Sequence, residues 1–269
     1  MNTNPKHAGT RAGKRPLSLG LVAAGAVAAT LLVPGLAPAD DGVAPAVIGG
    51  HDATEDYPFM VSLQFEGKHI CGGSLIRPDW VVTAAHCAAP PEALRVRIGS
   101  TDNTSGGAET GVIQRAVHPD YVPEEMGVGA DIALLKLDRP VEQAPIAIAP
   151  DSGVPGKDTR ILGWGRDCEG AGCGELPTML QELDTEVVAD EQCTGFTPGM
   201  EICTDSVTPN AQACHGDSGG PQIIGRPGDW ELTGATSRDG DEDPACATGT
   251  GIWTDVTAHR DWISATVGE

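Results

Sequence analysis

The chain has 269 residues, of which 40% are hydrophobic and 20% charged, so it can fold around a sizeable core as one large domain or two small ones. Aromatic residues make up only 4%, and the 36 glycines and 21 prolines favour a turn-rich β protein over a collagen-like or disordered chain. The net charge of −21 excludes binding to the phosphate backbone of nucleic acids as a main function.

The N-terminal segment has the three parts of a secretory signal peptide. Basic residues precede an uncharged, apolar run from Leu17 to Val33, and Ala37-Pro38-Ala39 has the small-residue form that signal peptidase cleaves. We therefore expect residues 1–39 to be the signal peptide of a secreted, extracellular protein. A membrane anchor is the alternative, but a run this short and rich in Ala and Gly lies at the lower limit for a membrane span.

The expected secretion decides how the eight cysteines are interpreted. In an oxidising environment an even number of cysteines favours disulfides, here four. Cys168 and Cys173 have a spacing that can begin a zinc site, but no second Cys or His pair follows at a suitable distance. We expect no metal and no cofactor.

Short strand-like runs separated by turn residues fill the rest of the chain. This pattern predicts an all-β protein with antiparallel strands in a sandwich or barrel, and the Pro-rich stretch near residues 140–155 is expected to connect two halves. A helix is expected at the C-terminus, where Thr254 or Asp255 can cap it and Ile263 and Val267 recur on one face. The expected strands are residues 59–65, 80–84, 95–98, 113–117, 132–137, 159–163, 182–188, 221–224 and 232–236.

Three short motifs each hold one side chain suited to chemistry: His86 in TAAHC, Asp131 in DIALL and Ser218 in CHGDSGGP. A serine hydroxyl is a weak nucleophile that needs a base, a histidine is such a base near neutral pH, and a carboxylate fixes the histidine's tautomer. The glycines around Ser218 let the N–H groups of Gly216 and Ser218 point to one spot and bind an oxyanion. Each motif alone is more often a packed histidine, a turn aspartate or a loop, but the three together predict nucleophilic catalysis.

Together TAAHC, DIALL and GDSGGP resemble the trypsin/chymotrypsin family of serine proteases, over residues 47 to about 267. The resemblance implies an all-β fold of two antiparallel six-stranded barrels with a C-terminal helix and the catalytic cleft between the barrels. It implies a secreted serine endopeptidase in which Ser218 forms an acyl-enzyme, His86 is the general base and Asp131 orients the histidine. The Ala- and Gly-rich leader further resembles those of secreted actinobacterial proteases.

The sequence Val47-Ile48-Gly49-Gly50 resembles the activation site of this family. The resemblance implies that the freed α-amino group of Val47 pairs with Asp217 and thereby shapes the oxyanion hole and the substrate pocket. A buried ammonium needs such a partner, so we expect residues 40–46 to be the short propeptide of an inactive zymogen and 47–269 to be the protease domain. Ala44-Pro45-Ala46 also has the form that signal peptidase cleaves, so direct cleavage before Val47, without a zymogen, is the alternative.

The resemblance also implies how the cysteines pair. One expected disulfide lies beside the histidine, and two brace the second barrel and the specificity pocket. These pairs are Cys71–Cys87, Cys193–Cys203 and Cys214–Cys246. Cys168 and Cys173 match no standard pair of the family, and a local disulfide between them is the simplest completion.

The residues expected to form the specificity pocket depart from the family pattern. The floor residue, six before the nucleophile, is Gln212 where trypsin-like members have Asp; the small Ala213 follows it, and Gly251 leaves one wall open. The opposite wall reads Ser237-Arg238-Asp239 where the family has Ser-Trp-Gly, so Asp239 can narrow the pocket, attract a basic side chain or pair with its neighbour. We expect a neutral or apolar side chain before the cleaved bond (P1), with Lys or Arg as the alternative.

Two other functions compete with this prediction. The sequence GDSGG also fits the G-x-S-x-G motif of α/β-hydrolase esterases, but those chains run Ser, acid, His, whereas the order here is His, Asp, Ser. A non-catalytic binding protein on a protease scaffold is the second, although all three catalytic side chains are present. The expected partners are protein or peptide substrates and protein inhibitors, and we expect a monomer without nucleic acid or, once the signal is removed, membrane association.

Overall fold

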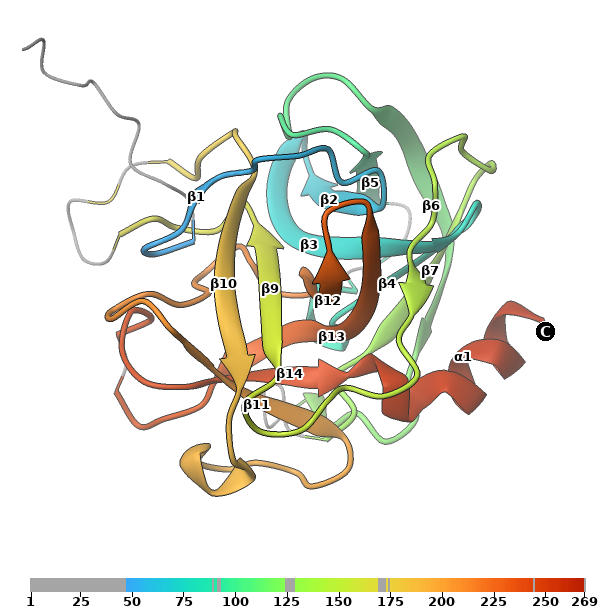
Figure 1. Cartoon of the computed structure of the whole chain (residues 1–269). Coiled ribbons are helices and arrows are strands. Elements are labelled where there is room, and N and C mark those ends of the chain that lie inside the picture. Colours follow the sequence, from blue (N-terminus) through green and yellow to red (C-terminus); the bar gives the residue numbers. More distant parts are fainter. Residues whose placement is uncertain are drawn as a thin grey trace, which may run out of the picture. The chain divides into compact units, whose positions relative to one another are not determined.

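The computed structural model describes residues 47–268, except 89, 91–92, 124–128, 169–172, 174 and 244 (Figure 1). The expected signal peptide (1–39) and propeptide (40–46) lie outside the described residues. Among the residues described, no helix has the length and apolarity needed to span a bilayer.

Six strands of the first half close into an antiparallel barrel, in the order β2-β3-β4-β7-β6-β5. The strands are β2 (Met60–Phe65), β3 (Lys68–Arg77), β4 (Trp80–Thr83), β5 (Leu94–Ile98), β6 (Ala108–Val117) and β7 (Ala133–Leu137). Strand β5 shows why this sequence forms a barrel wall. Leu94, Val96 and Ile98 are buried in the interior, whereas the arginines between them are not, which is the two-residue period of a strand with one face in a core.

Six strands of the second half form a second ring, β9-β10-β11-β14-β13-β12, which closes because β9 pairs with both β10 and β12. The strands are β9 (Asp158–Gly163), β10 (Gln181–Val187), β11 (Glu201–Ser206), β12 (Pro221–Arg226), β13 (Asp229–Asp239) and β14 (Gly251–Asp255). Two short strands lie beside this ring: β1 (His51–Asp52) pairs with β10, and β8 (Ala147–Ile148) pairs with β13 in parallel. The prediction of two six-stranded barrels is confirmed.

The Pro-rich connector is bonded to both barrels. The backbone N–H of Ile146 donates to the carbonyl oxygen of Leu75 in β3 at 2.9 Å, and that of Ala149 donates to Leu232 in β13 at 2.8 Å. The expected connector near residues 140–155 therefore also holds the two barrels together.

Backbone contact between the barrels requires glycine at position 72. A Cβ built on Gly72 would lie 2.6 Å from the Cα of Gly220, and the N–H of Gly72 donates to the carbonyl oxygen of Ser218 at 2.8 Å. Strand β3 was absent from the expected strands because Gly72 and Gly73 read as turn residues in sequence, although here they allow two backbones to approach. The prediction also missed β1, β8, β11 and β14.

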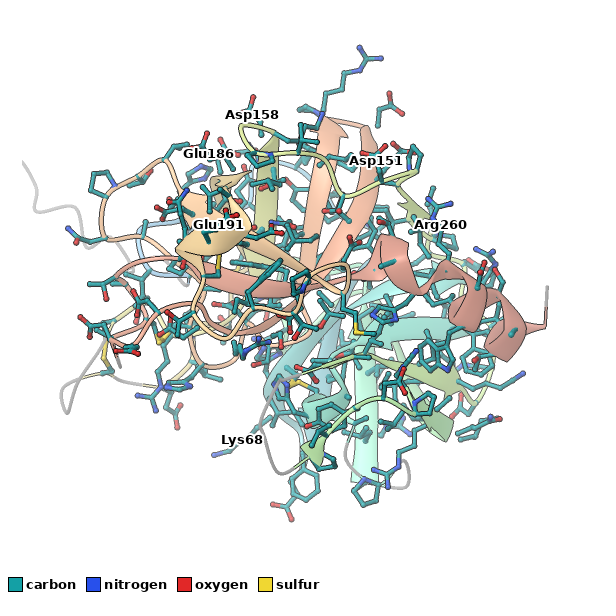
Figure 2. The ribbon with its side chains drawn as sticks, turned by 90° about the horizontal axis from the view of Figure 1, so that it is seen from below. Lys68, Asp151, Asp158, Glu186, Glu191 and Arg260 are labelled. Atoms are coloured by element: carbon teal, nitrogen blue, oxygen red, sulfur yellow. A yellow bond between two sulfur atoms is a disulfide. The ribbon has the colours of Figure 1, made fainter. Side chains whose placement is uncertain are left out.

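The C-terminal helix is present and continues a short 3₁₀ turn. The turn η5 (Val256–His259) begins at Asp255, whose Oδ1 accepts the N–H groups of Thr257 at 2.8 Å and Ala258 at 3.2 Å. Asp255 is thus the cap, rather than Thr254. Helix α1 (Arg260–Val267) follows, and the guanidinium of Arg260, labelled in Figure 2, donates to the carbonyl oxygens of Ile148 at 2.8 Å and Ala149. Two other 3₁₀ turns are η1 (Ala85–Cys87) and η4 (Asp190–Gln192).

Acidic side chains lie on the outer side of the second barrel. Figure 2 labels Asp158 and Glu186, which stand directly opposite each other on β9 and β10, and Glu191 on η4. Like charges placed opposite each other on neighbouring strands repel. These positions contribute to the negative charge of the protein without adding to its stability.

We predict that Gly72→Ala destabilises the protein by about 2 kcal/mol, because the new methyl group must push apart two backbones. Gly73→Ala is the matched variant in the same strand, where the new methyl would lie 3.0 to 3.1 Å from the side chains of Val81 and Leu63 and the carbonyl oxygen of Val82, a looser fit than the 2.6 Å at Gly72. Urea unfolding of the two variants measures the difference. Equal losses of stability in both would contradict the close approach of the barrels at Gly72.

Candidate active site

A buried carboxylate fixes the histidine of the TAAHC motif. The Nδ1 of His86 lies 2.8 Å from Oδ2 of Asp131, and the backbone N–H of His86 donates to Oδ1 at 3.0 Å. Since a carboxylate accepts, Nδ1 carries the proton, and Nε2 is left with a free lone pair. His86 lies on η1 directly after β4, whereas Asp131 comes just before β7, the strand that pairs with β4.

Asp131 is fully buried and still holds a low pKa. Burial by itself would raise the pKa of this carboxyl, but the hydrogen bonds and charge of His86, with a bond from Ser237, outweigh burial and place the pKa below its usual range. The hydroxyl of Ser237, on β13 of the second barrel, donates to Oδ2 of Asp131 at 2.7 Å. The carboxylate is therefore ionised at neutral pH, as the orientation of the imidazole requires.

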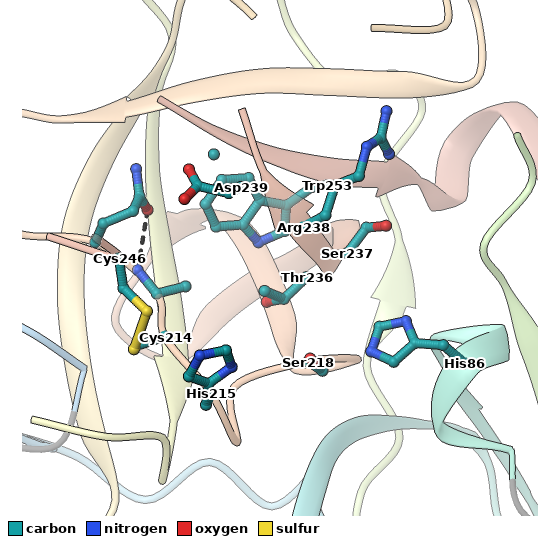
Figure 3. Close-up of a pocket in the computed structure, with 13 residues that line it drawn as sticks. His86, Cys214, His215, Ser218, Thr236, Ser237, Arg238, Asp239, Cys246 and Trp253 are labelled. Carbon is teal, nitrogen blue, oxygen red and sulfur yellow. Dashed lines mark hydrogen bonds between the residues drawn. A yellow bond between two sulfur atoms is a disulfide. The ribbon is translucent and has the colours of Figure 1, made fainter. Parts of the chain in front are cut away.

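Ser218 and His86 line one pocket of about 370 Å³. Figure 3 shows the imidazole of His86 turned toward Ser218 at one end of the pocket, with Cys214 and Cys246 at the other. The free Nε2 of His86 is thus on the side of the ring that can accept a proton from the serine hydroxyl.

The loop His215–Ser218, called the oxyanion loop below, contains a second buried carboxylate. Asp217 accepts the backbone N–H of Gly165 at Oδ1, 2.7 Å, and that of Cys214 at Oδ2, 2.9 Å. Burial raises the pKa of Asp217 to about 7, and the two backbone donors offset this only in part. Gly216 has φ +106°, a conformation that other residues rarely adopt.

A buried histidine that the sequence analysis did not single out contacts this loop from the first barrel. The Nε2 of His69 lies 3.0 Å from the carbonyl oxygen of Gly216, and its Nδ1 lies 2.8 Å from Oγ of Ser62. Burial lowers the pKa of His69 to about 4, so the ring is neutral, donates to Gly216 and accepts from Ser62. This bond holds the carbonyl of Gly216, and with it the peptide group that joins Gly216 to Asp217.

The structure places all five expected specificity residues around the same pocket as His86 and Ser218 (Figure 3). They are Gln212, Ala213, Ser237, Asp239 and Gly251. The amide oxygen of Gln212 accepts the N–H of Ala213 at 3.0 Å, and its nitrogen donates to the carbonyl of Gly249 at 3.4 Å. A Cβ on Gly251 would lie 2.5 Å from Cζ3 of Trp253 and 3.2 Å from Cδ of Gln212, so the close packing of the Trp253 ring requires glycine at this position.

Arg238 pairs with Glu201, and the described contacts include no bond between Arg238 and its neighbour Asp239. Its guanidinium donates to both carboxylate oxygens of Glu201, at 2.7 and 2.9 Å, and to the carbonyl of Gly195 at 2.8 Å. Glu201 is buried, so this pair is a fixed part of the second barrel. Burial, together with the nearby Asp241, raises the pKa of Asp239 to about 6, which leaves it mostly ionised at neutral pH.

Val47 is fully buried among second-barrel residues that include Ile161, Ala211 and Trp253. Ile48 pairs with Gln212 through two backbone hydrogen bonds of 3.1 and 3.0 Å. The segment that begins at Val47 therefore contacts the floor of the pocket.

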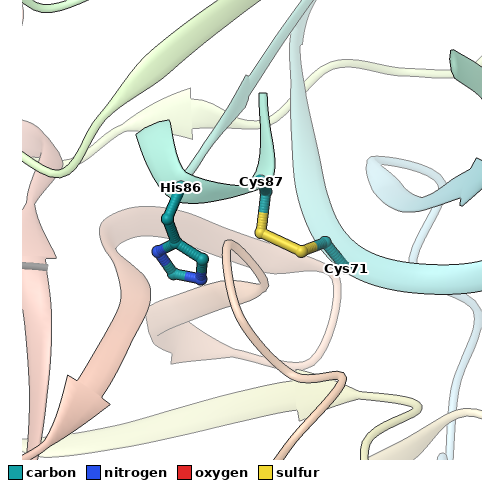
Figure 4. A group of neighbouring side chains, drawn as sticks. All are labelled: Cys71, His86 and Cys87. Carbon is teal, nitrogen blue, oxygen red and sulfur yellow. A yellow bond between two sulfur atoms is a disulfide. The ribbon is translucent and has the colours of Figure 1, made fainter. Parts of the chain in front are cut away.

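The eight cysteines form four disulfides, in the pairs that the resemblance implies together with the local pair Cys168–Cys173. Figure 4 shows His86 beside the Cys71–Cys87 disulfide. Cys214 and Cys246 lie similarly close to His215. The sulfur atoms of both groups are committed to disulfides, so neither group has the thiolates of a zinc site.

Sequence reasoning missed three side chains that shape this site: His69, Glu201 and Trp253. His69 is a lone histidine in a strand. Glu201 binds Arg238, which lies 37 residues further along the chain on another strand. No local pattern marks either residue. Trp253 lines the pocket from β14, one of the strands that the prediction did not contain.

Comparisons with known proteins agree with this geometry. The trypsin family model matches residues 47–263. A trypsin of Saccharopolyspora erythraea is 36% identical over 203 residues, which cover 71% of this chain and 86% of that protein. Among solved structures, neuropsin, a serine protease of mouse brain, has a TM-score of 0.72 at 26% identity, covering 82% of this chain and 100% of that one. Human heparin binding protein has a TM-score of 0.70 at 25% identity, covering 83% of this chain and 97% of that one.

The chain belongs to the trypsin family of serine proteases and is a serine endopeptidase, a hydrolase that acts on proteins or peptides.

Proposed function

We propose that this endopeptidase works through Ser218 as nucleophile, His86 as general base and Asp131 as the carboxylate that orients the base. The observation that carries this proposal is the bond between Nδ1 of His86 and Asp131, because it leaves Nε2 as the acceptor on the side of Ser218. The backbone N–H groups of Gly216 and Ser218 are the proposed oxyanion hole.

The reaction follows from these positions. The Oγ of Ser218 attacks the peptide carbonyl carbon while Nε2 of His86 takes its proton, and the carbonyl oxygen becomes an oxyanion that the two N–H groups stabilise. The C–N bond then breaks as His86 returns the proton to the leaving amine, which gives an acyl-enzyme. Water repeats the sequence with His86 as base and releases the acid. Asp131 stays ionised throughout and stabilises the imidazolium.

We expect Ser218→Ala to lower kcat by at least about 10⁴-fold on peptide substrates and to abolish labelling by a fluorophosphonate, because the nucleophile is removed. Ser105→Ala, an exposed serine remote from the pocket lining, should leave both unchanged. Intact mass before and after labelling measures the single adduct. Hydrolysis that survives in Ser218→Ala would contradict the assigned nucleophile, and a correctly trimmed wild-type chain that neither hydrolyses nor labels would favour a binding protein on this scaffold.

We further propose that the chain matures by loss of residues 1–39 as signal peptide and 40–46 as propeptide, so that the protease domain begins at Val47. The four disulfides are consistent with an extracellular protein. Val47 has φ +58° in the uncut chain, a strained conformation for a β-branched residue that cleavage before it would relieve. The mature enzyme is proposed to act as a monomer, with protein inhibitors as partners besides its substrates.

The buried carboxyl of Asp217 supports activation by the new N-terminus. Among the described residues, its hydrogen bonds come from two neutral backbone donors, and burial raises its pKa to about 7. That part of the uncut chain supplies no cation beside it, although an ionised buried carboxylate needs one. The α-amino group freed at Val47 would supply that charge. Asp217 would then be ionised, and the oxyanion loop that contains it would be fixed.

We predict opposite effects of Asp217→Asn in the two forms of the chain. In the precursor, the folded state holds a proton on Asp217 that the unfolded state releases between about pH 4 and 7, so stability falls as pH rises through this range. Asn removes this cost, so at about pH 8 the variant precursor should be about 2 kcal/mol more stable than the parent, with little difference at about pH 4. In the chain starting at Val47, Asn should instead destabilise the protein, because the α-ammonium loses its partner.

Urea unfolding of both forms in the Ser218→Ala background, which prevents self-cleavage, measures these stabilities. The same sign of effect in the two forms would count against the Val47–Asp217 pair.

For specificity, we propose a neutral or apolar P1 side chain. The floor residue Gln212 is uncharged and its amide is already bonded within the protein. Asp239 adds a negative charge on the wall, which disfavours acidic side chains. The alternative is a basic P1 side chain held by Asp239, since Arg238 is paired with Glu201.

Profiling kcat/KM across peptides that differ only at P1 separates these alternatives. We expect neutral side chains to be cleaved fastest, Asp239→Asn to change their kcat/KM by less than about twofold, and Gln212→Asp to create cleavage after Lys and Arg, because an ion pair then forms at the floor. If the wild type cleaves best after Lys or Arg and Asp239→Asn removes that preference, the wall carboxylate sets the specificity and the neutral assignment is wrong.

A further inference from the structure

The described residues 165–168 and 175–178, which flank the Cys168–Cys173 disulfide, are together called the bracing segment below, and both parts contact the oxyanion loop. At its start, the N–H of Arg166 donates to the carbonyl oxygen of His215 at 2.9 Å, next to the bond from Gly165 to Asp217. Towards its end, Leu176 packs on Gly216: a Cβ built on Gly216 would lie 3.3 Å from Cδ2 of this leucine. The oxyanion loop therefore lies between two parts of one segment.

The far end of the bracing segment is tied to the first barrel. The backbone N–H of Asn103 donates to the carbonyl oxygen of Thr178 at 2.9 Å, and its side-chain nitrogen donates to that of Pro177 at 3.1 Å. Asn103 is buried, so these bonds are shielded from water. The part that contains Leu176 is thus held by the first barrel, and the Cys168–Cys173 disulfide links it to the part that contains Arg166.

Gly216 depends on such support. Its φ of +106° is open to glycine alone, and a glycine without neighbours to hold it samples many backbone conformations. Its N–H group shares a planar peptide group with the carbonyl of His215, so the bond from Arg166 to that carbonyl sets the direction of the N–H. Leu176 and the backbone of Gly165 pack on Gly216 itself. Without the disulfide, Arg166 and Leu176 would be joined only by the chain between them, and this longer path is less restricted.

We infer that the Cys168–Cys173 disulfide is a positioning element for catalysis: it presses the bracing segment against the oxyanion loop and so keeps the N–H of Gly216 aimed at the developing oxyanion. The inference rests on the proposed oxyanion hole. Because the oxyanion exists only in the transition state and the intermediates close to it, weaker positioning lowers kcat and leaves KM nearly unchanged. A disulfide that only stabilises the fold would change the melting temperature and leave kcat per active site as it was.

The test compares the mature enzyme with the double variant Cys168→Ser/Cys173→Ser, with active sites counted by fluorophosphonate titration. We expect kcat per titrated site to fall about tenfold, less than the 10²–10³-fold that follows complete loss of an oxyanion donor, and KM to change by less than about twofold. A peptide aldehyde, which forms a tetrahedral adduct with the serine, should bind more weakly by the same factor as kcat.

A second pair of variants leaves the disulfide intact. Leu176→Ala should lower kcat in the same way, whereas Met179→Ala, an apolar truncation at a half-exposed position just beyond the bracing segment, should not. In the disulfide-free background Leu176→Ala should have a smaller effect than in the wild type, because the contact is already loosened.

Unchanged kcat per titrated site in both the disulfide-free variant and Leu176→Ala overturns the inference while the proposed function stands. A wild type that takes no label and shows no turnover overturns the proposed function, and the inference with it.

Discussion

A carboxylate removed from water must be surrounded by donors, and Asp131 takes its donors from both barrels. His86 contributes two N–H groups from the first barrel, and Ser237 contributes its hydroxyl from β13 of the second. The hydroxyl of Thr254, on β14, also donates to the carbonyl oxygen of Asp131 at 2.9 Å. Since an unsatisfied buried charge is costly, these bonds require the two barrels to be docked before the imidazole is oriented. The glycine contact between Gly72 and Gly220 makes that docking sterically possible.

Two buried aspartates of one protein have opposite pKa shifts because their surroundings differ. Asp131 has a histidine and a hydroxyl as partners, and its pKa is low; Asp217 has two backbone amides, and its pKa is raised to about 7. The first carboxylate is ionised wherever the fold is intact. The carboxyl of Asp217 needs a nearby cation to be ionised, and its described hydrogen bonds come only from neutral backbone N–H groups. The fold can therefore form with Asp131 ionised while Asp217 is still protonated, and under the proposed activation Asp217 becomes ionised only afterwards.

The sequence was most informative where chemistry dictates the residue type. The motifs around the proposed catalytic residues His86, Asp131 and Ser218 stood out because the roles of nucleophile, base and orienting carboxylate need three different side chains. Alternation marked strands such as β5. Strand β3 was missed because its two adjacent glycines suggest a turn, whereas Gly72 serves a contact with the other barrel, which no local pattern reveals. For the same reason the role of His69 became visible only in the fold, where it reaches Gly216 across 147 residues. The sequence left open whether Asp239 pairs with Arg238. In the structure the guanidinium of Arg238 binds Glu201.

Arg238 shows that the charge of a pocket-lining residue depends on its ion-pair partner as well as on its position in the sequence. In sequence it stands where the family has an aromatic residue, and a pair with its neighbour Asp239 was one of the open alternatives. In the fold its guanidinium is turned to the buried Glu201, which neutralises it and fixes the strand on which Ser237 and Asp239 lie. The charge that a substrate meets on this wall is therefore that of Asp239, made harder to ionise by burial and by the neighbouring Asp241.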